Sequence, residues 1–194
     1  MIRPQARAVL DQLYAQDAAE RAAGLPSALR KRNVEWETGM FLSLVARATD
    51  AWSILEIGSS NGVSTIWLAL AAREIGGHVL GLELDPARAA EARANLAAAG
   101  LADVATVRCC DALQEVTELE GPFDLAFIDA EKQDYALHIR NVIDRVKANG
   151  LIIADNVISH DIADYQAFVR DRADVATITL PLNRGLEFSL KMRT

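Results

Sequence analysis

Short apolar runs rich in β-branched residues alternate along this chain with segments of helical periodicity, and this alternation constrains the fold more than any other feature. Strands that are apolar along their whole length are covered on both faces, as in parallel sheets. Helices connect such strands and pack on both sides of the sheet. The alternation therefore predicts an α/β fold class, with a doubly wound, mostly parallel sheet and helices on both faces. The first five strands are expected at 53–57, 78–83, 104–108, 123–128 and 150–154.

Between these strands, apolar residues recur three and four positions apart in alanine- or leucine-rich segments, which predicts helices. The helix that begins at Pro86 has clear end signals. Asp85 is a good N-cap, proline suits a first helical position, and Gly100 suits the left-handed residue after the last turn. The three helices are expected at 63–75, 86–99 and 133–146.

The two ends of the chain depart from this pattern. At the carboxyl end, 175–180 and 186–191 alternate in polarity around a short Pro-Leu-Asn-Arg-Gly connection, which indicates an antiparallel hairpin. The sheet is then expected to be seven-stranded. Before Trp52, helical segments are expected at about 4–22 and 36–48.

Length and charge restrict the functional classes. With 194 residues we expect one domain, made of a helical cap at 1–50 and a core at 51–194. The 20 Lys and Arg against 27 Asp and Glu give a formal net charge of −7. An acidic surface repels phosphate backbones and anionic membranes, so we expect no nucleic-acid partner and no membrane partner. The local basic cluster Arg30-Lys31-Arg32 is either a solvated face or a patch that steers an anionic molecule.

The cysteines and the chain start bear on location. Cys109 and Cys110 are the two cysteines, and neighbours in sequence rarely meet disulfide geometry, so a reducing compartment is expected. The first residues lack an apolar signal core, and no run approaches the roughly 18 apolar residues of a membrane span. We therefore expect a cytoplasmic protein.

The residues that follow each strand are the candidate ligand-binding residues, because ligands of open parallel sheets bind beyond the carboxyl ends of the strands. The loop Glu56-Ile-Gly58-Ser-Ser-Asn-Gly62-Val-Ser64 follows the first strand. Its small residues let the backbone approach a ligand and direct helix N–H groups at an anion. Its spacing is not the G-x-G-x-x-G of dinucleotide binding, and a tight turn without a ligand is the alternative.

Two carboxylates follow the next strands. Glu83 ends the second strand, where an acidic side chain can accept hydrogen bonds from both hydroxyls of a ribose. Alternatively, Glu83 is a solvated carboxylate at the strand end. Asp111 follows the third strand. It can accept a hydrogen bond from an adenine amino group, or it can cap the helix expected from Ala112 without any ligand.

The fourth and fifth strands end in a set of hard oxygen donors. Asp129 follows one strand, and Asp155 and Asn156 follow the other. Two carboxylates and an amide oxygen suit Mg²⁺, and buried carboxylates this close repel one another unless a cation joins them. The alternative is that these residues make helix caps and turns. Lys132, three positions after Asp129, is on the same side of a helical turn and is either a general base or a surface lysine.

Together these motifs resemble the class I S-adenosylmethionine-dependent O-methyltransferases of the catechol and caffeoyl-CoA type. The resemblance extends from about Thr38 to Lys191. Its most specific part pairs the Asp129/Lys132 motif with Asp155-Asn156. The segments that carry it are Glu56-Ile-Gly58, Leu82-Glu83-Leu-Asp85, Phe127-Ile-Asp129-Ala-Glu131-Lys132-Gln-Asp-Tyr135, Gly150-Leu-Ile-Ile-Ala-Asp155-Asn156 and the closing Leu180-Pro-Leu-Asn-Arg-Gly-Leu-Glu-Phe-Ser-Leu-Lys191.

The resemblance implies a Rossmann-like methyltransferase fold, S-adenosylmethionine (SAM) as cofactor, a small hydroxylated aromatic acceptor and a homodimer. It implies that Ser64 binds the methionine carboxylate, Glu83 the ribose hydroxyls and Asp111 the adenine. A divalent cation, expected to be Mg²⁺, is held by Asp129, Asp155 and Asn156. The catalytic residues are Lys132, as the general base, and Asp129. The full cofactor set is Glu56, Gly58, Ser59, Ser60, Gly62, Ser64, Glu83, Asp111 and Asp129.

The chain departs from the family beyond Asn156, where it re-enters a helical pattern without the longer insertion of the plant CoA-ester enzymes. Its amino-terminal section is also short. Both regions shape the acceptor pocket in the family, so this pocket is expected to be more open or to borrow a wall from a second subunit. His160 is either a substrate or metal contact or a solvated loop residue. The alternative functions are a methyltransferase acting on a hydroxylated tRNA base and a non-catalytic nucleotide-binding module.

Overall fold

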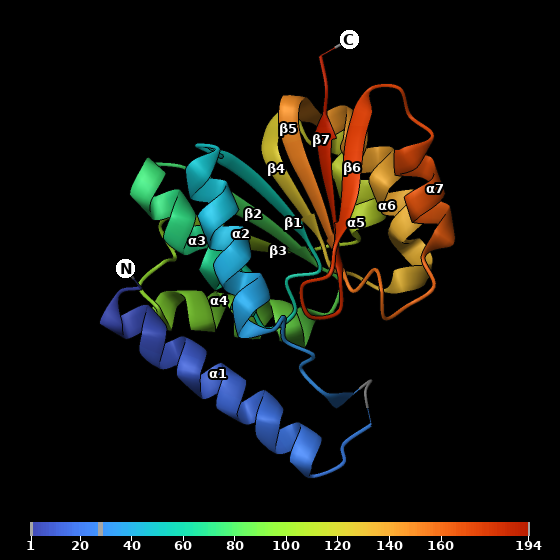
Figure 1. The fold of residues 1–194 in the computed structure, drawn as a ribbon. Helices are drawn as coiled ribbons and strands as arrows, with labels where there is room; N and C mark the ends of the chain where they lie inside the picture. The colour runs from blue at the N-terminus through green and yellow to red at the C-terminus, as the bar shows by residue number, and fades with distance from the viewer. Residues whose placement is uncertain (1, 27–28, 194) are drawn as a thin grey trace.

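The computed structural model describes residues 2–26 and 29–193. Its centre is a seven-stranded sheet of order β3-β2-β1-β4-β5-β7-β6 (Figure 1). The first five strands are parallel, and β7 runs antiparallel to both β5 and β6. This confirms the predicted fold class. The strands are β1 Ser53–Ile57, β2 His78–Glu83, β3 Ala105–Cys109, β4 Phe123–Ile128, β5 Val146–Asp155, β6 Val175–Leu180 and β7 Leu186–Lys191.

The helices form a layer on each face of the sheet (Figure 1). Helices α1 to α4 lie on one side and α5 to α7 on the other, and 3₁₀ turns at Lys132–Asp134 and Ile143–Arg145 flank α6. The α-helices are α1 Pro4–Ala22, α2 Trp36–Ala48, α3 Val63–Ile75, α4 Pro86–Ala98, α5 Ala112–Glu118, α6 Tyr135–Val142 and α7 Ala163–Arg170. None of the helices within the described residues combines the length and apolarity that a membrane span needs.

Two hydrophobic cores explain why the inner parallel strands, such as β1 and β4, are buried on both faces. Ile54 belongs to the core beneath α1 to α4, whereas Leu55 belongs to the core beneath α5 to α7. Successive strand residues point to opposite faces, so an inner strand needs apolar residues at both odd and even positions, whereas the edge-side strand β3 alternates. The sheet is therefore a rigid layer, and its strand ends are held in fixed relative positions.

The predicted end signals of α4 are confirmed. The Asp85 carboxylate accepts hydrogen bonds from the N–H groups of Ala87 and Arg88 and caps α4, and Gly100 has φ +70°. The predicted strand 104–108 is shifted by one residue, which is within the usual uncertainty of strand ends.

The helix predicted at 133–146 is wrong in extent. A 3₁₀ turn precedes α6, a second follows it, and β5 already begins at Val146, which pairs with Phe123. The apolar residues Ile139, Val142 and Val146 keep helical spacing across this boundary, so periodicity alone did not reveal the change. For the same reason β5 is longer than the strand predicted at 150–154.

The strand order reverses between β1 and β4. Chains that leave these two strands cover opposite faces of the sheet, which opens a crevice at their carboxyl ends. The loops after β1, β2, β4 and β5 meet there.

Candidate active site

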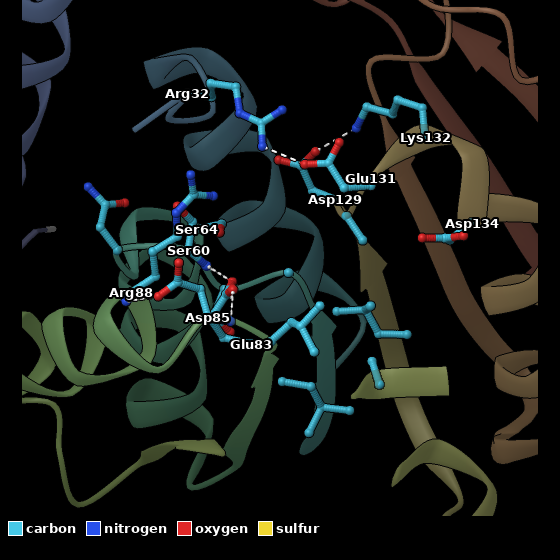
Figure 2. A pocket seen from close by; sticks show the side chains of 18 of the residues that line it. Arg32, Ser60, Ser64, Glu83, Asp85, Arg88, Asp129, Glu131, Lys132 and Asp134 are labelled. Carbon is cyan, nitrogen blue, oxygen red and sulfur yellow. Dashed lines mark hydrogen bonds and ion pairs between the residues drawn. The ribbon is translucent and has the colours of Figure 1, made fainter. Parts of the chain in front are cut away.

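A cavity of about 740 Å³ opens at the carboxyl ends of the strands (Figure 2). This volume falls within the roughly 300–1,000 Å³ typical of small-molecule sites. Its wall contains the loops after β1, β2 and β4, the start of α5, and the segment 30–34 that precedes α2. The predicted residues that line it are Gly58, Ser59, Ser60, Ser64, Glu83, Asp111, Asp129, Lys132 and Asn156.

The loop after β1 needs its glycines for packing. Gly58 has φ +90°, and a Cβ there would lie 2.2 Å from the carbonyl oxygen of Asp129. The loops after β1 and β4 therefore touch, and only glycine fits between them. Gly62, also at φ +90°, precedes α3, and no described side chain caps this helix. The first N–H groups of α3 are thus available to an anionic group.

Glu56 supports this loop from within the protein. Its side chain is fully buried and accepts hydrogen bonds from Ser59 Oγ, at 2.7 Å, and from Thr65 Oγ1. Burial raises the pKa of the Glu56 carboxyl, and the neighbouring hydroxyls partly offset this effect. Glu56 is not among the residues that line the cavity. The structure therefore places it beneath the predicted cofactor site.

Glu83 joins two of the loops. Its carboxylate accepts hydrogen bonds from the backbone N–H of Ser60, at 2.7 Å, and of Asp85, at 2.9 Å (Figure 2). A carboxylate has about four lone-pair sites, so two remain for a ligand. The side chain lines the cavity, although Glu83 is only 8% exposed. Glu83 is therefore fixed in place before any ligand binds.

Asp111 is a helix cap, as one interpretation of the sequence predicts, and its adenine contact stays a prediction. Its side chain caps α5 by accepting a hydrogen bond from the N–H of Leu113 at 2.9 Å. It also lines the cavity. The cap accounts for the residue locally and leaves other lone pairs of the carboxylate available.

Asp129 and Lys132 form an ion pair at the cavity wall. Lys132 Nζ lies 2.8 Å from Asp129 Oδ1, and both side chains are less than one-fifth exposed (Figure 2). The N–H of Asp129 donates to the carbonyl of Ile57 at 2.9 Å, which holds this residue beside the end of β1. The offset of three residues brings the two side chains together, as the sequence predicts.

Asp155 is buried behind this pair. It is 1% exposed, and its Oδ1 accepts a hydrogen bond from the N–H of Asn156 at 2.7 Å. Its Oδ2 is buried without a hydrogen-bond partner among the described residues. Burial, and then the nearby charge of Asp129, raise the pKa of the Asp155 carboxyl to about 7. Asn156, in a left-handed conformation at φ +64°, lines the cavity next to it.

These residues fit a divalent cation. An unpartnered buried carboxylate oxygen beside a second carboxylate and an amide is the arrangement that a hard cation satisfies. Over the described part of the chain, no three His, Cys, Asp or Glu side chains gather in metal-binding geometry. A metal site here would therefore depend on two carboxylates and an amide, with water or substrate as further ligands.

Sequence reasoning missed one residue of this site, Tyr135. Its ring is fully buried, and its hydroxyl contacts Lys132 Nζ. The same oxygen lies 3.1 Å from the carbonyl oxygens of both Ile128 and Asp155. The available signal was its offset of three from Lys132, which repeats the offset between Lys132 and Asp129.

The basic cluster lies over the cavity. Arg30, Lys31 and Arg32 all line it. Lys31 pairs with Glu91 of α4, and an Arg32 nitrogen lies 2.7 Å from a carboxylate oxygen of Glu131. The Arg32 guanidinium holds the pKa of the Glu131 carboxyl below its usual value. Two of the three cations thus hold the segment 30–34 against the site instead of forming a free basic patch.

His160 also lines the cavity, and its Nδ1 lies 2.9 Å from the hydroxyl oxygen of Ser159. The structure therefore keeps it near the site without giving it a carboxylate partner among the described residues.

Comparison with known proteins identifies the family. The sequence profile of the O-methyltransferase family matches residues 4–187. The chain belongs to the O-methyltransferase family. Catechol O-methyltransferase of Mycobacterium tuberculosis is 41% identical over 160 residues, which are 80% of this chain and 72% of that protein. Catechol O-methyltransferase of Niastella koreensis is 38% identical over 152 residues, which are 76% and 66% of the two chains.

Solved structures agree with this assignment. The O-methyltransferase of Bacillus cereus, in complex with SAH, matches with a TM-score of 0.81 and 28% identity over 95% of this chain and 90% of that one. Caffeoyl-CoA O-methyltransferase 1 of Eucalyptus globulus is 29% identical over 161 residues, 77% of this chain and 64% of that protein. The predicted family, the SAM-dependent O-methyltransferase activity and the SAM cofactor are confirmed. The non-catalytic module is thereby excluded.

Proposed function

We propose that this O-methyltransferase transfers the methyl group of SAM to a hydroxyl of a small catechol-like aromatic and requires a divalent cation held by Asp129, Asp155 and Asn156. The observation that carries the proposal is the unpartnered buried Oδ2 of Asp155, next to the Asp129–Lys132 ion pair at the cavity wall. The catechol O-methyltransferases among the relatives support the choice of acceptor.

The cofactor would bind along β1 and β2. The uncapped start of α3 and Ser64 suit the methionine carboxylate, because helix N–H groups and hydroxyls bind anions. The free lone pairs of Glu83 suit the ribose hydroxyls, and Asp111 suits an adenine amino group. Ser59 and Ser60 line the same wall. With the cofactor in this order, its sulfonium methyl would face the side of β4, where Lys132 lies.

The acceptor hydroxyl must lose its proton for the reaction to be fast, because a phenol with a pKa near 10 is a poor nucleophile at neutral pH. When bound, Mg²⁺ would supply positive charge that favours the phenolate and would orient a vicinal diol. Lys132 would accept this proton as a neutral amine, after its ammonium has released a proton to solvent. Asp129, 2.8 Å away, then stabilises the ammonium that forms.

The transfer step balances without a further reactant. The acceptor oxygen forms a bond to the methyl carbon, the carbon–sulfur bond breaks, and its electron pair stays on sulfur to give SAH. The proton stays on Lys132 until solvent removes it. Since the leaving group is already present on the sulfonium, the protein mainly positions and deprotonates the acceptor.

The structure favours a small acceptor over a hydroxylated tRNA base. The chain carries a net charge of −7, and Lys31 and Arg32 are occupied by carboxylates at the cavity. A protein that binds RNA needs cations free to contact phosphates. The resemblance also supports a homodimer, which light scattering of the purified protein tests.

The proposal is tested by methyl transfer from SAM to a panel of catechols, with Mg²⁺ and with a chelator, in wild type and Asp129→Ala. We expect wild type to methylate vicinal diols when Mg²⁺ is present. The chelator should abolish this activity, and Asp129→Ala should lack it. Activity that is unchanged by chelation and by the substitution would exclude the metal mechanism. Methyl incorporation into bulk tRNA, with none into any diol, would instead support the tRNA function.

A further inference from the structure

Tyr135 is the first residue of α6, yet its side chain reaches the ends of two strands. The ring is fully buried and packs against Tyr165, with 5.8 Å between ring centroids. Its hydroxyl lies 3.1 Å from the carbonyl oxygen of Ile128, the last residue of β4, and 3.1 Å from that of Asp155, the last residue of β5. This one oxygen therefore joins the ends of the two strands that carry Asp129 and Asp155.

The same oxygen also contacts the amine. Lys132 Nζ donates to the Tyr135 hydroxyl and to Asp129 Oδ1, and it lies 4.4 Å from the centroid of the tyrosine ring. A hydroxyl has one proton and two lone pairs. Since Lys132 occupies a lone pair, the single proton is shared between the carbonyls of Ile128 and Asp155. Asp129 Oδ1 is a longer third acceptor, at 3.5 Å. Burial raises the pKa of Tyr135 well above its ordinary value, which keeps this proton on the phenol.

We propose that Tyr135 is a positioning residue for methyl transfer: its hydroxyl holds the Lys132 amine and the ends of β4 and β5 in the geometry that deprotonation and cation binding need. Tyr135 does not line the cavity, so it acts through Lys132, Asp129 and Asp155. This inference depends on the proposed function. In this arrangement two acceptors fix the Lys132 amine, the Asp129 carboxylate and the Tyr135 hydroxyl. The same buried hydroxyl therefore supports both deprotonation of the acceptor and cation binding.

The test removes one oxygen atom. Tyr135→Phe keeps the ring and its packing, and Tyr165→Phe is the matched control. Tyr165 is also fully buried and contacts the same ring, but among the described residues its hydroxyl makes no hydrogen bond to Asp129, Lys132 or Asp155. Each variant is compared with wild type in kcat, in KM for SAM, and in Mn²⁺ affinity measured by electron paramagnetic resonance without acceptor or SAM.

For Tyr135→Phe we expect kcat to fall by about 10- to 100-fold, because a small displacement of a reacting group has an effect of this size. Mn²⁺ affinity should fall about 10-fold, the lower end of the loss of about 10- to 100-fold that follows when the support of metal-ligating groups is removed. The KM for SAM should stay within about twofold, because Ser64, Glu83 and Asp111, which we propose to bind SAM, have no hydrogen bond to Tyr135 among the described contacts. The control Tyr165→Phe should match wild type in all three.

A double-mutant cycle separates positioning from general support of the fold. If Tyr135 acts through Lys132, adding Tyr135→Phe to Lys132→Met should slow the enzyme by less than about twofold further. Full additivity, an equal loss in Tyr165→Phe, or wild-type kcat and Mn²⁺ affinity in Tyr135→Phe would each overturn the role. A wild type that neither binds Mn²⁺ nor methylates diols contradicts the proposed function itself, and the role of Tyr135 with it.

Discussion

The two sides of the cavity differ in how the protein holds the carboxylates that we propose to bind ligands. On the side of β1 and β2, Glu83 accepts two backbone N–H groups and Asp111 caps α5. On the side of β4 and β5, a carboxylate oxygen of Asp155 is buried without a partner among the described residues. Unsatisfied buried groups are costly. Glu83 and Asp111 are therefore held in place before a ligand arrives, whereas we propose that a cation satisfies the free oxygen of Asp155. Beneath the first side, Glu56 Oε1 is also buried without a partner among the described residues, but Glu56 does not line the cavity.

Lys132→Met should have the largest effect and should affect one side alone. Loss of the proposed base lowers kcat by about 10²- to 10⁴-fold, the usual contribution of a positioned proton acceptor. SAH affinity, measured by calorimetry, should stay within about twofold because the amine lies on the side of β4. Lys147→Met is the control, since Lys147 pairs with Asp124 near the opposite end of β4. An equal loss of kcat in both variants would contradict the role of Lys132.

Gly58→Ala should disturb both sides, because Gly58 is where the loops after β1 and β4 touch. The new Cβ would lie 2.2 Å from the Asp129 carbonyl oxygen. We expect the free energy of unfolding to fall by about 1–3 kcal/mol more than in a variant with left-handed strain alone. Gly76→Ala supplies that control, because Gly76 has φ +73° and open space around it. Denaturant unfolding measures both, and equal losses would mean that the two loops are not tightly packed.

Glu83→Gln should weaken the cofactor side without affecting the cation. The amide loses the charge and turns an N–H₂ group toward one of the two backbone donors. We expect SAH affinity to fall about tenfold, or about 1.4 kcal/mol, with Mg²⁺ affinity unchanged. Calorimetric titration with each ligand measures both affinities. A parallel loss of Mg²⁺ binding would show that the two sides are not independent.

Metal-free protein should lose stability as pH rises, through Asp155. The folded state holds a proton up to about pH 7 at this carboxyl, whereas the unfolded chain releases it near its ordinary pKa of about 3.9. Stability from this group is therefore full below about pH 4 and is lost as pH rises toward 7. We expect the Tm of the wild type to fall across this pH window. In Asp155→Asn the fall in Tm should be smaller by a few degrees. An identical pH profile in the variant would assign the loss to other groups.

The fold was predictable because its signals are local. Pro86, Asp85 and Gly100 mark the ends of α4, and the parallel strands are recognisable by their apolar runs. The boundary at Val146 was hidden because helical spacing continues into the strand. The site was predictable where residues directly follow strands, as Asp129 and Asn156 do. Glu56 and Tyr135 lie beneath the cavity, and a linear pattern does not show which strand-end atoms a buried side chain meets.

The cation requirement is tested most directly by calorimetric titration of Mg²⁺ into SAH-bound wild type and Asp155→Asn. The substitution keeps the side chain's size and removes the charge whose oxygen lacks a partner. We predict one Mg²⁺ site in the wild type and its loss in the variant, with SAH affinity the same in both. Equal Mg²⁺ binding by the two proteins, or none by wild type, would contradict the account of this site.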